Sequence, residues 1–507
     1  MQARRVAQHW LTLDGDGALQ TQIVRALRTA ILRGELPPGH RLPSTRTLAR
    51  ELEVSRTTSQ HAYEQLLTEG YLEARRGSAT RVASTLDPVA STPDEAAPPS
   101  SPALSAYGQR LSEGAFGYPY RAFAEQELAR FELLYGLPDH RAFPLDAWRK
   151  ALTDAARHAT PRALSYGEPE GTESLRQAIA RHILSARGVR CHPDQIIVVA
   201  GVQQALALVA RLLLDPGDRV VLEEPGYLGA RAAFASAGAR LVPAPVDEQG
   251  IDVTAVPRRT RCRLVYVTPS HQFPTGRIMS LSRRQMLLSW AAGQDACIFE
   301  DDYDGELRYE GRPIETLYAL DGGHRVIFAG TFSKTLFPSL RIGYIVVPPS
   351  LVDVVRAAKW TSDWSCPNLE QVALTSFIES GDFARHLRRS RLRYASKRRA
   401  LLEELTLALG GLSHQVDWQV GGGAAGLHIV LWLPKTSPRE LARIVVRARA
   451  LDVGIYSIAP YYLGEPRSGL LIGYGLLDEA SLREAIRRLG RAIRADGTPR
   501  AAERRPR

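Results

Sequence analysis

Lysine is scarce in this chain of 507 residues. Lysine and arginine together number 65, yet only five are lysines: Lys150, Lys334, Lys359, Lys397 and Lys435. An arginine guanidinium stays charged in proteins and is no nucleophile, whereas a buried lysine amine can lose its proton and react with an aldehyde. A lysine that persists where arginine has replaced nearly every other cation therefore indicates chemistry that arginine cannot perform.

Cysteine and long apolar runs are also lacking. The four cysteines are scattered, with neither a CxxC pair nor a dense framework, so we expect reduced thiols and no metal site. No apolar run approaches the roughly 18 residues of a membrane span. The N-terminal stretch MQARRVAQHWLTLDGDG lacks the apolar core of a signal peptide. We therefore expect a cytoplasmic protein, associated with the nucleoid when it binds DNA.

The length predicts more than one domain. Residues 1–83 show helical periodicity with a strand-like end, residues 84–117 are a Pro/Ala/Ser-rich stretch typical of an extended linker, and residues 496–507 form a basic tail. The net charge of +11 is compatible with a nucleic-acid partner, but a genomic base-composition bias toward arginine explains it equally well.

Residues 118–495 have the pattern of an α/β fold. Short apolar runs alternate with amphipathic helices, and six of these runs are IIVVAG (196–201), RVVLEE (219–224), RLVYVTP (263–269), CIFEDD (297–302), RVIFAG (325–330) and YIVVPP (344–349). Continuous apolar strands separated by helices predict a mostly parallel sheet between helices. The end of this segment mixes strands and helices, which predicts a smaller C-terminal α+β lobe.

The segment from Leu36 to Ala83 has the pattern of a winged helix-turn-helix. Pro43 and Ser44 are expected to open one helix and Ser55 to be the N-cap of the next, and each helix has one apolar face. Two short strands follow, around Gly77, in the manner of a wing. The N-terminal residues of a recognition helix face the bases, whereas arginines elsewhere hold phosphates. The expected DNA contacts are Arg46, Arg56, Thr57, Thr58, Gln60, Arg75, Arg76 and Gly77. The alternative is that these arginines only solvate a small helical domain.

Lys334 lies in the stretch TFSKTLFPSLRIGY, beside groups that suit a phosphorylated aldehyde. Thr331 and Ser333 offer hydroxyls, and Arg341 offers the planar fork that binds phosphate. Upstream, AGVQQALALVARLL is a strand-to-helix turn led by a glycine, where backbone N–H groups bind phosphate. The residues at that helix start are Gly201, Val202 and Gln203.

Two further strands end in candidate pocket residues. Tyr227 follows RVVLEE and can stack on a flat ring. In FEDDYDGE, Asp301 or Asp302 can keep a pyridine nitrogen protonated, and Tyr303 can donate to a ring oxygen. The alternatives are core packing for Tyr227, and a solvated turn or a divalent-metal site for the acidic run.

These motifs resemble two known families. GxLxPGxRLPSxRxLA, VSRTT, AYxxLxxEGYL and GxxTxV resemble the winged helix of GntR-type transcription regulators, over residues 10–83. SYGEPEGTESLRQAIA, TPSHQFPTGRIMS, EDDYDGELRYEGRP and GTFSKTLFPSLRIGY resemble fold type I pyridoxal-5′-phosphate proteins of the aminotransferase family. The combination resembles the MocR subfamily, which joins both parts.

The resemblance implies a role for each matching residue. Lys334 matches the lysine that forms the internal aldimine with pyridoxal 5′-phosphate, and Asp301 matches the carboxylate under the pyridine nitrogen, with Asp302 as its neighbour. The other matches are Tyr303 to the 3-oxygen contact, Tyr227 to the stacking aromatic, Arg341 and Ser333 to the phosphate clamp, and Tyr166 to the tyrosine that reaches the partner subunit's phosphate. The last match implies a homodimer with shared sites.

Two positions depart from the catalytic aminotransferases. Phe273 stands where those enzymes have an asparagine that contacts the 3-oxygen, which leaves His271 or Gln272 as substitutes. The arginine that grips an α-carboxylate would fall close to Leu471, so that role passes to Arg467 or Arg231 or is lost.

We therefore expect a transcription regulator in which pyridoxal phosphate, held as an aldimine, senses the cofactor itself or an amine or amino-acid effector and alters operator binding. One alternative is an active aminotransferase with a tethered DNA-binding domain. Another is a DNA-binding protein whose second domain is a cofactor-free dimerisation scaffold, because fold alone does not establish function.

Overall fold

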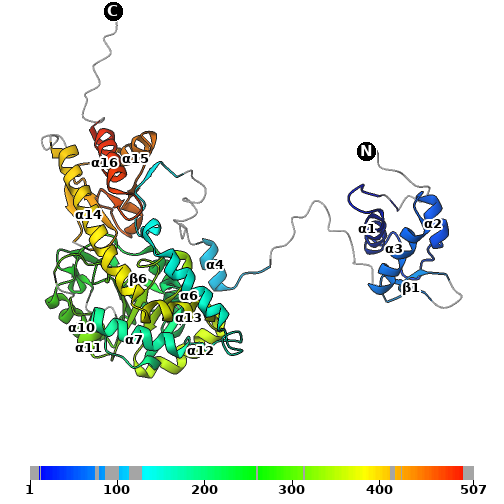
Figure 1. The fold of residues 1–507 in the computed structure, drawn as a ribbon, viewed down its shortest axis with the longest axis horizontal. Helices are drawn as coiled ribbons and strands as arrows, with labels where there is room; N and C mark the ends of the chain where they lie inside the picture. Colours follow the sequence, from blue (N-terminus) through cyan, green and yellow to red (C-terminus); the bar gives the residue numbers. More distant parts are fainter. Residues whose placement is uncertain are drawn as a thin grey trace, which may run out of the picture. The chain divides into compact units, whose positions relative to one another are not determined.

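The chain divides into two compact units, residues 1–103 and 104–507 (Figure 1). The computed structural model describes residue 11 and residues 13–74, 79–85, 102–113, 128–257, 261–311, 314–410, 417–423 and 425–494. Each unit has its own buried core.

The first unit is a winged helix-turn-helix, as the sequence predicts. Its elements are α1 (Leu19–Leu32), α2 (Thr45–Glu51), α3 (Arg56–Thr68) and the antiparallel pair β1 (Leu72–Glu73) and β2 (Arg81–Val82). Ser44 caps α2 by accepting from the Thr47 backbone N–H at 3.1 Å, and Ser55 caps α3 by accepting from the Thr58 N–H at 3.0 Å. Both caps satisfy a donor that has no partner within the helix.

The core of this unit forms where the three helices meet. Ala62, Tyr63 and Leu66 of α3 are buried against α1 and α2, because their spacing places them on one face of the helix. The Tyr63 hydroxyl donates to the backbone carbonyl of Pro43 at 2.9 Å, just before α2. This hydrogen bond ties α3 to the residues that lead into α2.

A helix lies where the sequence predicts only an extended linker. Helix α4 (Ala106–Glu113) belongs to the second unit and contacts α9 (Leu228–Ser236). Its Arg110 donates to the backbone carbonyl of Ser236 at 2.8 Å. The Pro/Ala/Ser composition concealed the helical spacing of Tyr107 and Leu111, and docking on α9 stabilises a helix too short to persist alone.

The second unit is built on an eight-stranded sheet, in the order β4-β11-β10-β9-β8-β5-β6-β7. The strands are β4 (Ile196–Val199), β5 (Arg219–Glu224), β6 (Arg240–Asp247), β7 (Gly250–Ile251), β8 (Leu264–Val267), β9 (Cys297–Asp301), β10 (Val326–Thr331) and β11 (Gly343–Val346). The central pairings from β10 through β9, β8 and β5 to β6 are parallel, whereas those of β11 and β7 are antiparallel. The predicted mostly parallel sheet is confirmed.

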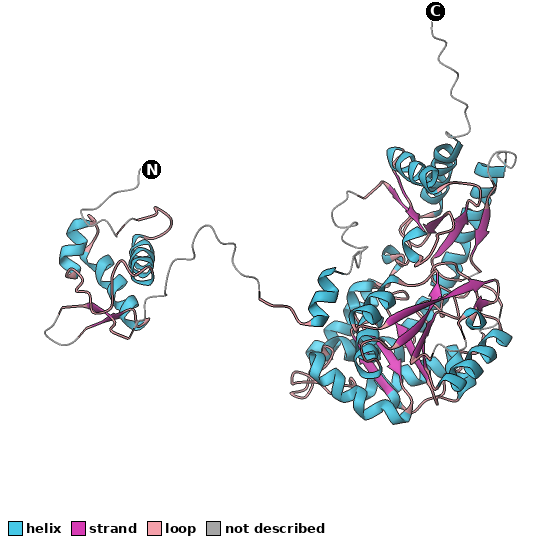
Figure 2. Cartoon of the chain, turned by 180° about the vertical axis from the view of Figure 1, so that it is seen from behind, coloured by secondary structure: helices cyan, strands magenta, loops and turns pink. Residues whose placement is uncertain are grey.

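Helices cover both faces of this sheet (Figure 2). Ile196 and Val198 of β4 enter the core that holds one set of helices, and Ile197 and Val199 enter the other, because successive strand residues face opposite ways. One face carries α8 (Val202–Leu213), α9 and α12 (Val352–Asp363). The other carries α6 (Leu145–Arg157), α7 (Glu173–Arg187), α10 (Leu281–Gln294), α11 (Leu317–Asp321), α13 (Asn368–Glu379) and α14 (Asp382–Gly410).

A smaller lobe completes the unit. Its sheet has the order β12-β13-β16-β15, with β12 (Gln419–Gly421), β13 (His428–Trp432), β15 (Tyr456–Ser457) and β16 (Gly469–Gly473). Strand β3 (Phe131–Glu132) pairs in parallel with β14 (Val453–Gly454), and α16 (Glu479–Arg494) packs against both α14 and α15 (Pro438–Ala450). The predicted α+β lobe is confirmed, and β3 connects the start of the unit to it.

Candidate functional site

Lys334 follows the carboxyl end of β10, where parallel α/β sheets bind their ligands. Its Nζ donates to the backbone carbonyl of Gly136 at 2.8 Å. Burial lowers the pKa of Lys334 below its ordinary value, while the charges of Asp304 and Asp301 act in the opposite direction. An amine held this way releases its proton more readily than an exposed lysine does.

The two neighbouring aspartates of the acidic run have different surroundings. Arg187 binds Asp302 through both carboxylate oxygens, at 2.6 Å to Oδ2 and 2.9 Å to Oδ1. Tyr266 donates to Oδ2 of Asp301 at 2.7 Å, but the buried Oδ1 accepts no hydrogen bond from any described residue. Burial raises the pKa of Asp301 to about 7. A buried acceptor without a donor fits the protonated nitrogen of a pyridine ring.

A buried trio extends this region. His271 Nδ1 lies 2.8 Å from Asp304 Oδ2 and 3.0 Å from the Tyr303 hydroxyl. Burial raises the pKa of Tyr303 well above its ordinary value, so the phenol keeps its proton and remains a donor. The acidic run therefore does not gather into one cluster, since Asp302 pairs with Arg187 and Asp304 with His271.

The structure separates the two substitutes for the missing asparagine. The side chain of Gln272 is already used: Oε1 accepts from the N–H and hydroxyl of Thr275 in the same loop, and Nε2 donates to the carbonyl of Pro225, which follows β5, at 2.9 Å. His271 instead contacts Tyr303 and keeps a buried Nε2 that has no partner among the described residues. Of the two, His271 is the one next to a candidate cofactor ligand.

A concave cradle lies at the start of α8. Gly201 has a φ of +86°, which favours glycine, and a Cβ built on it would lie 3.1 Å from Nη2 of Arg341. That guanidinium also donates to the backbone carbonyl of Ala200. Bare backbone facing a guanidinium at a helix start is a phosphate-binding arrangement.

The remaining predicted phosphate ligands lie on two elements: Thr331 and Ser333 at the end of β10, and Val202 and Gln203 at the start of α8. Thr331 and Ser333 are buried, and the Thr331 hydroxyl accepts from the Ser333 N–H at 3.2 Å. Val202 is half-buried at the first position of α8. Gln203 is exposed, and its Nε2 donates to the backbone carbonyl of Gly229 at 3.0 Å.

Tyr227 is half-buried at the start of α9. Its ring stacks on that of Tyr266 with centroids 6.5 Å apart, and Tyr266 is the residue that donates to Asp301. Phe273 meets the Tyr227 ring edge-on at 6.0 Å. The structure thus brings the predicted stacking aromatic, the pyridine carboxylate and the asparagine-replacing phenylalanine into one region.

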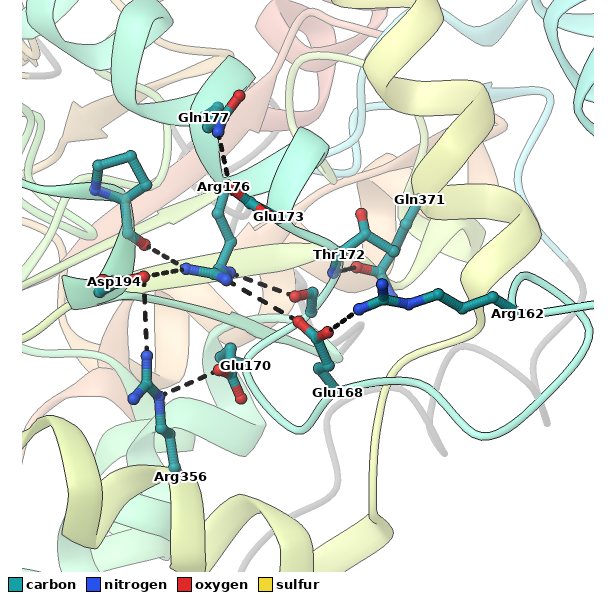
Figure 3. Close-up of polar contacts among 12 residues, drawn as sticks. Arg162, Glu168, Glu170, Thr172, Glu173, Arg176, Gln177, Asp194, Arg356 and Gln371 are labelled. Carbon is teal, nitrogen blue, oxygen red and sulfur yellow. Dashed lines mark hydrogen bonds and ion pairs between the residues drawn. The ribbon is translucent and has the colours of Figure 1, made fainter. Parts of the chain in front are cut away.

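Tyr166 lies at the surface. Its side chain is 80% exposed and stacks on Trp364 at 4.7 Å. The following stretch is held by Arg176 of α7, which donates to the carbonyl of Gly171 at 3.2 Å and to Asp194 at 2.9 Å (Figure 3). Glu168 joins Arg162 to this network at 2.5 Å. The segment that presents Tyr166 outward is therefore firmly anchored.

The expected DNA-reading residues lie at the surface of the first unit. Arg56, Thr57 and Gln60 are exposed at the start of α3, and Arg46 is exposed on α2. Thr58 is half-buried, and its hydroxyl bonds that of Ser55 at 2.7 Å. The wing residues Arg75, Arg76 and Gly77 lie outside the described residues.

Sequence reasoning missed several groups of the site. Asp304, Arg187, Tyr266 and the carbonyl of Gly136 were not assigned, although each contacts a predicted site residue. Two of them lie inside quoted stretches, Asp304 in FEDDYDGE and Tyr266 in RLVYVTP, but neither stretch indicated the contact that the residue makes. Arg187 at the end of α7 and Gly136 in a turn come from parts of the chain far from the residues that they contact.

The pocket residues fit pyridoxal phosphate. Asp301 has an unused buried oxygen, Gly201 and Arg341 form a cradle, and Lys334 supplies an amine of lowered pKa. When bound, this cofactor supplies an aldehyde carbon that reacts with amines and a protonated ring that accepts electrons.

Within the described part of the chain, no helix is both long and apolar enough to cross a membrane.

Comparison with known proteins agrees with both halves of the chain. The family of bacterial regulatory proteins named gntR matches residues 19–82, and aminotransferase class I and II matches residues 135–489. The probable rhizopine catabolism regulatory protein MocR of Rhizobium meliloti is 38% identical, over 96% of each chain. The pyridoxine biosynthesis transcriptional regulator PdxR of Corynebacterium glutamicum is 32% identical, over 94% of this chain and 96% of that protein.

Among solved structures, the α-aminoadipate aminotransferase LysN of Thermus thermophilus, complexed with N-(5′-phosphopyridoxyl)-L-leucine, is 30% identical with a TM-score of 0.68. It covers 77% of this chain, and 97% of that enzyme is matched. These matches imply pyridoxal 5′-phosphate as cofactor and DNA as partner. The chain belongs to the MocR-type transcriptional regulators, in which a GntR helix-turn-helix domain precedes an aminotransferase-like, pyridoxal-phosphate-dependent domain.

Proposed function

We propose that the pocket at Lys334 is a sensor: it holds pyridoxal phosphate covalently, and its occupancy by the cofactor or by an amine effector alters operator binding. The observation that carries the proposal is the buried Oδ1 of Asp301, an acceptor for which no residue that the structure describes supplies a donor. Burying a polar atom unpaired costs about 1 to 3 kcal/mol. A pyridine N–H removes that cost, so cofactor binding and pocket stability are coupled.

Each residue has a proposed role. Lys334 attaches the cofactor, Asp301 binds its ring nitrogen, and Tyr303 with His271 faces its 3-oxygen. Tyr227 stacks on the ring. The phosphate is bound by the helix start at Val202 and Gln203 and by Thr331, Ser333 and Arg341. Asp304 is a positioning residue, because it fixes His271 through a buried 2.8 Å contact.

We propose a homodimer with shared sites. Tyr166 and Trp364 form an exposed stack, flanked by Leu164 and Trp360, which are 69% and 51% exposed. An apolar patch of this kind is typical of an interaction surface. A second copy of the chain that covers it would place each Tyr166 hydroxyl near the partner's phosphate.

The regulatory effect requires that a ligand bind one arrangement of the dimer more tightly than another. Arg56, Thr57, Thr58 and Gln60 are the proposed base-reading residues, and Arg46 and the wing residues the proposed phosphate contacts. In this proposal the protein is cytoplasmic and associates with the nucleoid through these contacts.

Turnover as an aminotransferase is the alternative function. Phe273 and Leu471 favour sensing, because they replace polar groups that those enzymes use. The alternative predicts conversion of an amino donor to its oxo product by the cofactor-loaded protein, whereas the sensor predicts binding without sustained turnover.

The direct test is borohydride reduction of the cofactor-loaded protein followed by peptide mapping. The label is expected on Lys334, and Lys334→Arg is expected to lose it and the visible absorption band while its helix-turn-helix still binds DNA. A label on another amine would overturn the assignment. Operator binding is then compared with and without cofactor, and identical affinities would refute sensing.

A further inference from the structure

An aromatic wall stands beside Lys334. The carbonyl that Lys334 binds belongs to Gly136, and the preceding residue, Tyr135, turns its ring toward Phe273 at 5.9 Å and Tyr461 at 6.2 Å. The hydroxyls of Tyr135 and Tyr461 hydrogen-bond each other. The two hydroxyls are therefore paired with each other, and the rest of each ring is carbon.

Leu471 lies at the base of this wall. Its neighbours in β16, Leu470 and Ile472, face the core that contains α14 and α16, so the strand alternation turns Leu471 to the other side. There it is fully buried with Tyr461, and Tyr135 and Phe273 pack against the same cluster. Of these three residues of β16, Leu471 is thus the one in the same buried cluster as the aromatic wall, and its side chain is aliphatic.

Arg231 contacts the residues on either side of Tyr461, but its guanidinium is already hydrogen-bonded there. Arg231 donates through Nη1 to the carbonyls of Pro460 and Tyr462, at 3.2 Å each. The next residues of that segment donate to Oε1 of Glu224, at 2.6 Å from Leu463 and 2.8 Å from Gly464. The negative charge of Glu224 therefore partly neutralises that of Arg231, beside the segment 460–464 that both residues bind.

The other cationic candidates are also unsuited to a buried anion. Arg467 is exposed and lies over the ring of Trp432 at 4.7 Å. His428 contacts Tyr135 and Phe273, and burial lowers its pKa to about 3, so it is neutral at physiological pH. Among the described residues of the wall, none offers an unopposed positive charge.

We propose that Tyr135, Phe273, Tyr461 and Leu471 form the effector subsite, and that the effector is a primary amine with an apolar or aromatic body and no carboxylate beside its nitrogen. Burying a carboxylate without a cationic partner is costly, whereas the wall favours carbon. This inference rests on the proposed function, because only an amine competes with the Lys334 amine in a cofactor-loaded pocket.

The test titrates the full-length, cofactor-loaded protein with 2-phenylethylamine and with L-phenylalanine, which differ only in the carboxylate. The readout is the visible absorption of the bound cofactor. The expected dissociation constant of the amine is lower by about tenfold or more. Equal or tighter binding of L-phenylalanine overturns the inference, and so does a failure of the amine to bind.

Two variants locate the subsite. Leu471→Arg is expected to narrow or reverse the preference for the amine. Because an arginine there can unfold the lobe, Phe273→Leu provides a second measurement: it keeps an apolar side chain and is expected to weaken 2-phenylethylamine more than propylamine. Equal losses for both ligands would remove Phe273 from the subsite and overturn the proposal.

Arg467→Ala tests the alternative carboxylate site, since Arg467 is exposed and lies over Trp432, which is not one of the four proposed subsite residues. It is expected to leave the ratio of the two dissociation constants unchanged, and a ratio that shifts in favour of the amine would assign a carboxylate site to Arg467. Borohydride mapping separates the two levels of failure. A labelled Lys334 without amine binding refutes this inference alone, whereas an unlabelled Lys334 refutes the proposed function beneath it.

Discussion

Arg187 holds the carboxylate of Asp302 with two hydrogen bonds, at 2.6 and 2.9 Å, in a site where both side chains are buried. From the part of the chain that the structure describes, the adjacent Asp301 receives only one side-chain hydrogen bond, from Tyr266. Asp301 is the last residue of β9 and Asp302 follows it, and successive side chains point in opposite directions. Asp302 is therefore turned toward the ion pair with Arg187, and Asp301 toward the candidate pocket. Their substitution therefore separates stability from cofactor binding.

Asp301→Asn is expected to weaken pyridoxal phosphate binding by about tenfold or more, because an amide does not hold the ring nitrogen protonated. Asp302→Asn is expected instead to lower the free energy of unfolding by about 3 to 5 kcal/mol, because it leaves Arg187 buried and unpaired. Cofactor titration and urea unfolding of both variants provide the measurement. If Asp302→Asn alone abolished cofactor binding in a folded protein, the assignment of the two carboxylates would be reversed.

The stability of the cofactor-free protein is expected to fall as pH rises from about 4 to about 7. Burial raises the pKa of Asp301 from 3.8 to about 7, so in this window the folded state keeps a proton that the unfolded state has released. Asp301→Asn removes this titration and is expected to show a shallower decline. Glu223 and Glu300, whose pKa values burial also raises to about 7, contribute to the remaining slope. Parallel curves for the two proteins in urea unfolding would contradict the assignment.

Arg56→Ala and Arg46→Ala are expected to weaken DNA binding in different ways. A base-reading arginine contributes about 1 to 3 kcal/mol of discrimination, so loss of Arg56 reduces affinity for the operator more than for unrelated DNA. A phosphate contact acts on all sequences alike, so loss of Arg46 weakens both and lowers the salt dependence of log K by about one. Affinities for operator and scrambled DNA over a range of salt concentrations test this. An unchanged operator preference in Arg56→Ala would remove that residue from the groove.

Tyr166→Phe is expected to weaken cofactor binding by about tenfold while leaving the dimer intact. The substitution keeps the ring that stacks on Trp364 and removes only the hydroxyl, which in the proposed dimer donates to the partner's phosphate. Light scattering reports the oligomeric state, and the visible band reports the cofactor. Trp364→Ala is the companion variant, expected to weaken the dimer itself. Unaltered cofactor affinity in a dimeric Tyr166→Phe protein would show that the hydroxyl does not reach a shared site.

The winged helix could be read almost completely from local patterns. Ser55 caps α3 as expected, and α2 begins where Pro43 and Ser44 predict a helix start, because both signals depend on a few adjacent residues. The central strands also follow from their apolar runs. Helix α4 escaped prediction because its stability comes from contacts with α9, which is distant in sequence.

The choice between chemically equal neighbours could not be read in this way. His271 and Gln272 both suit a ring oxygen, but the side chain of Gln272 bonds Thr275 in its own loop and the carbonyl of Pro225, 47 residues earlier in the chain. The residue types can be read from the sequence, but the backbone conformation of the loop decides which of the two side chains points toward the pocket.

By itself, the sequence determined the kind of protein: a GntR helix-turn-helix joined to an aminotransferase-like domain, with one lysine in a position where arginine has no equivalent chemistry. Those signals are local, since caps, apolar strands and motifs each depend on residues a few positions apart. Only the tertiary structure decided which carboxylate keeps an oxygen without a donor among the described residues, that His271 and not Gln272 contacts Tyr303, and that Leu471 packs with aromatic rings. These outcomes depend on strands and loops that approach from distant parts of the chain, and their desolvation and pairing exist only once the chain has folded.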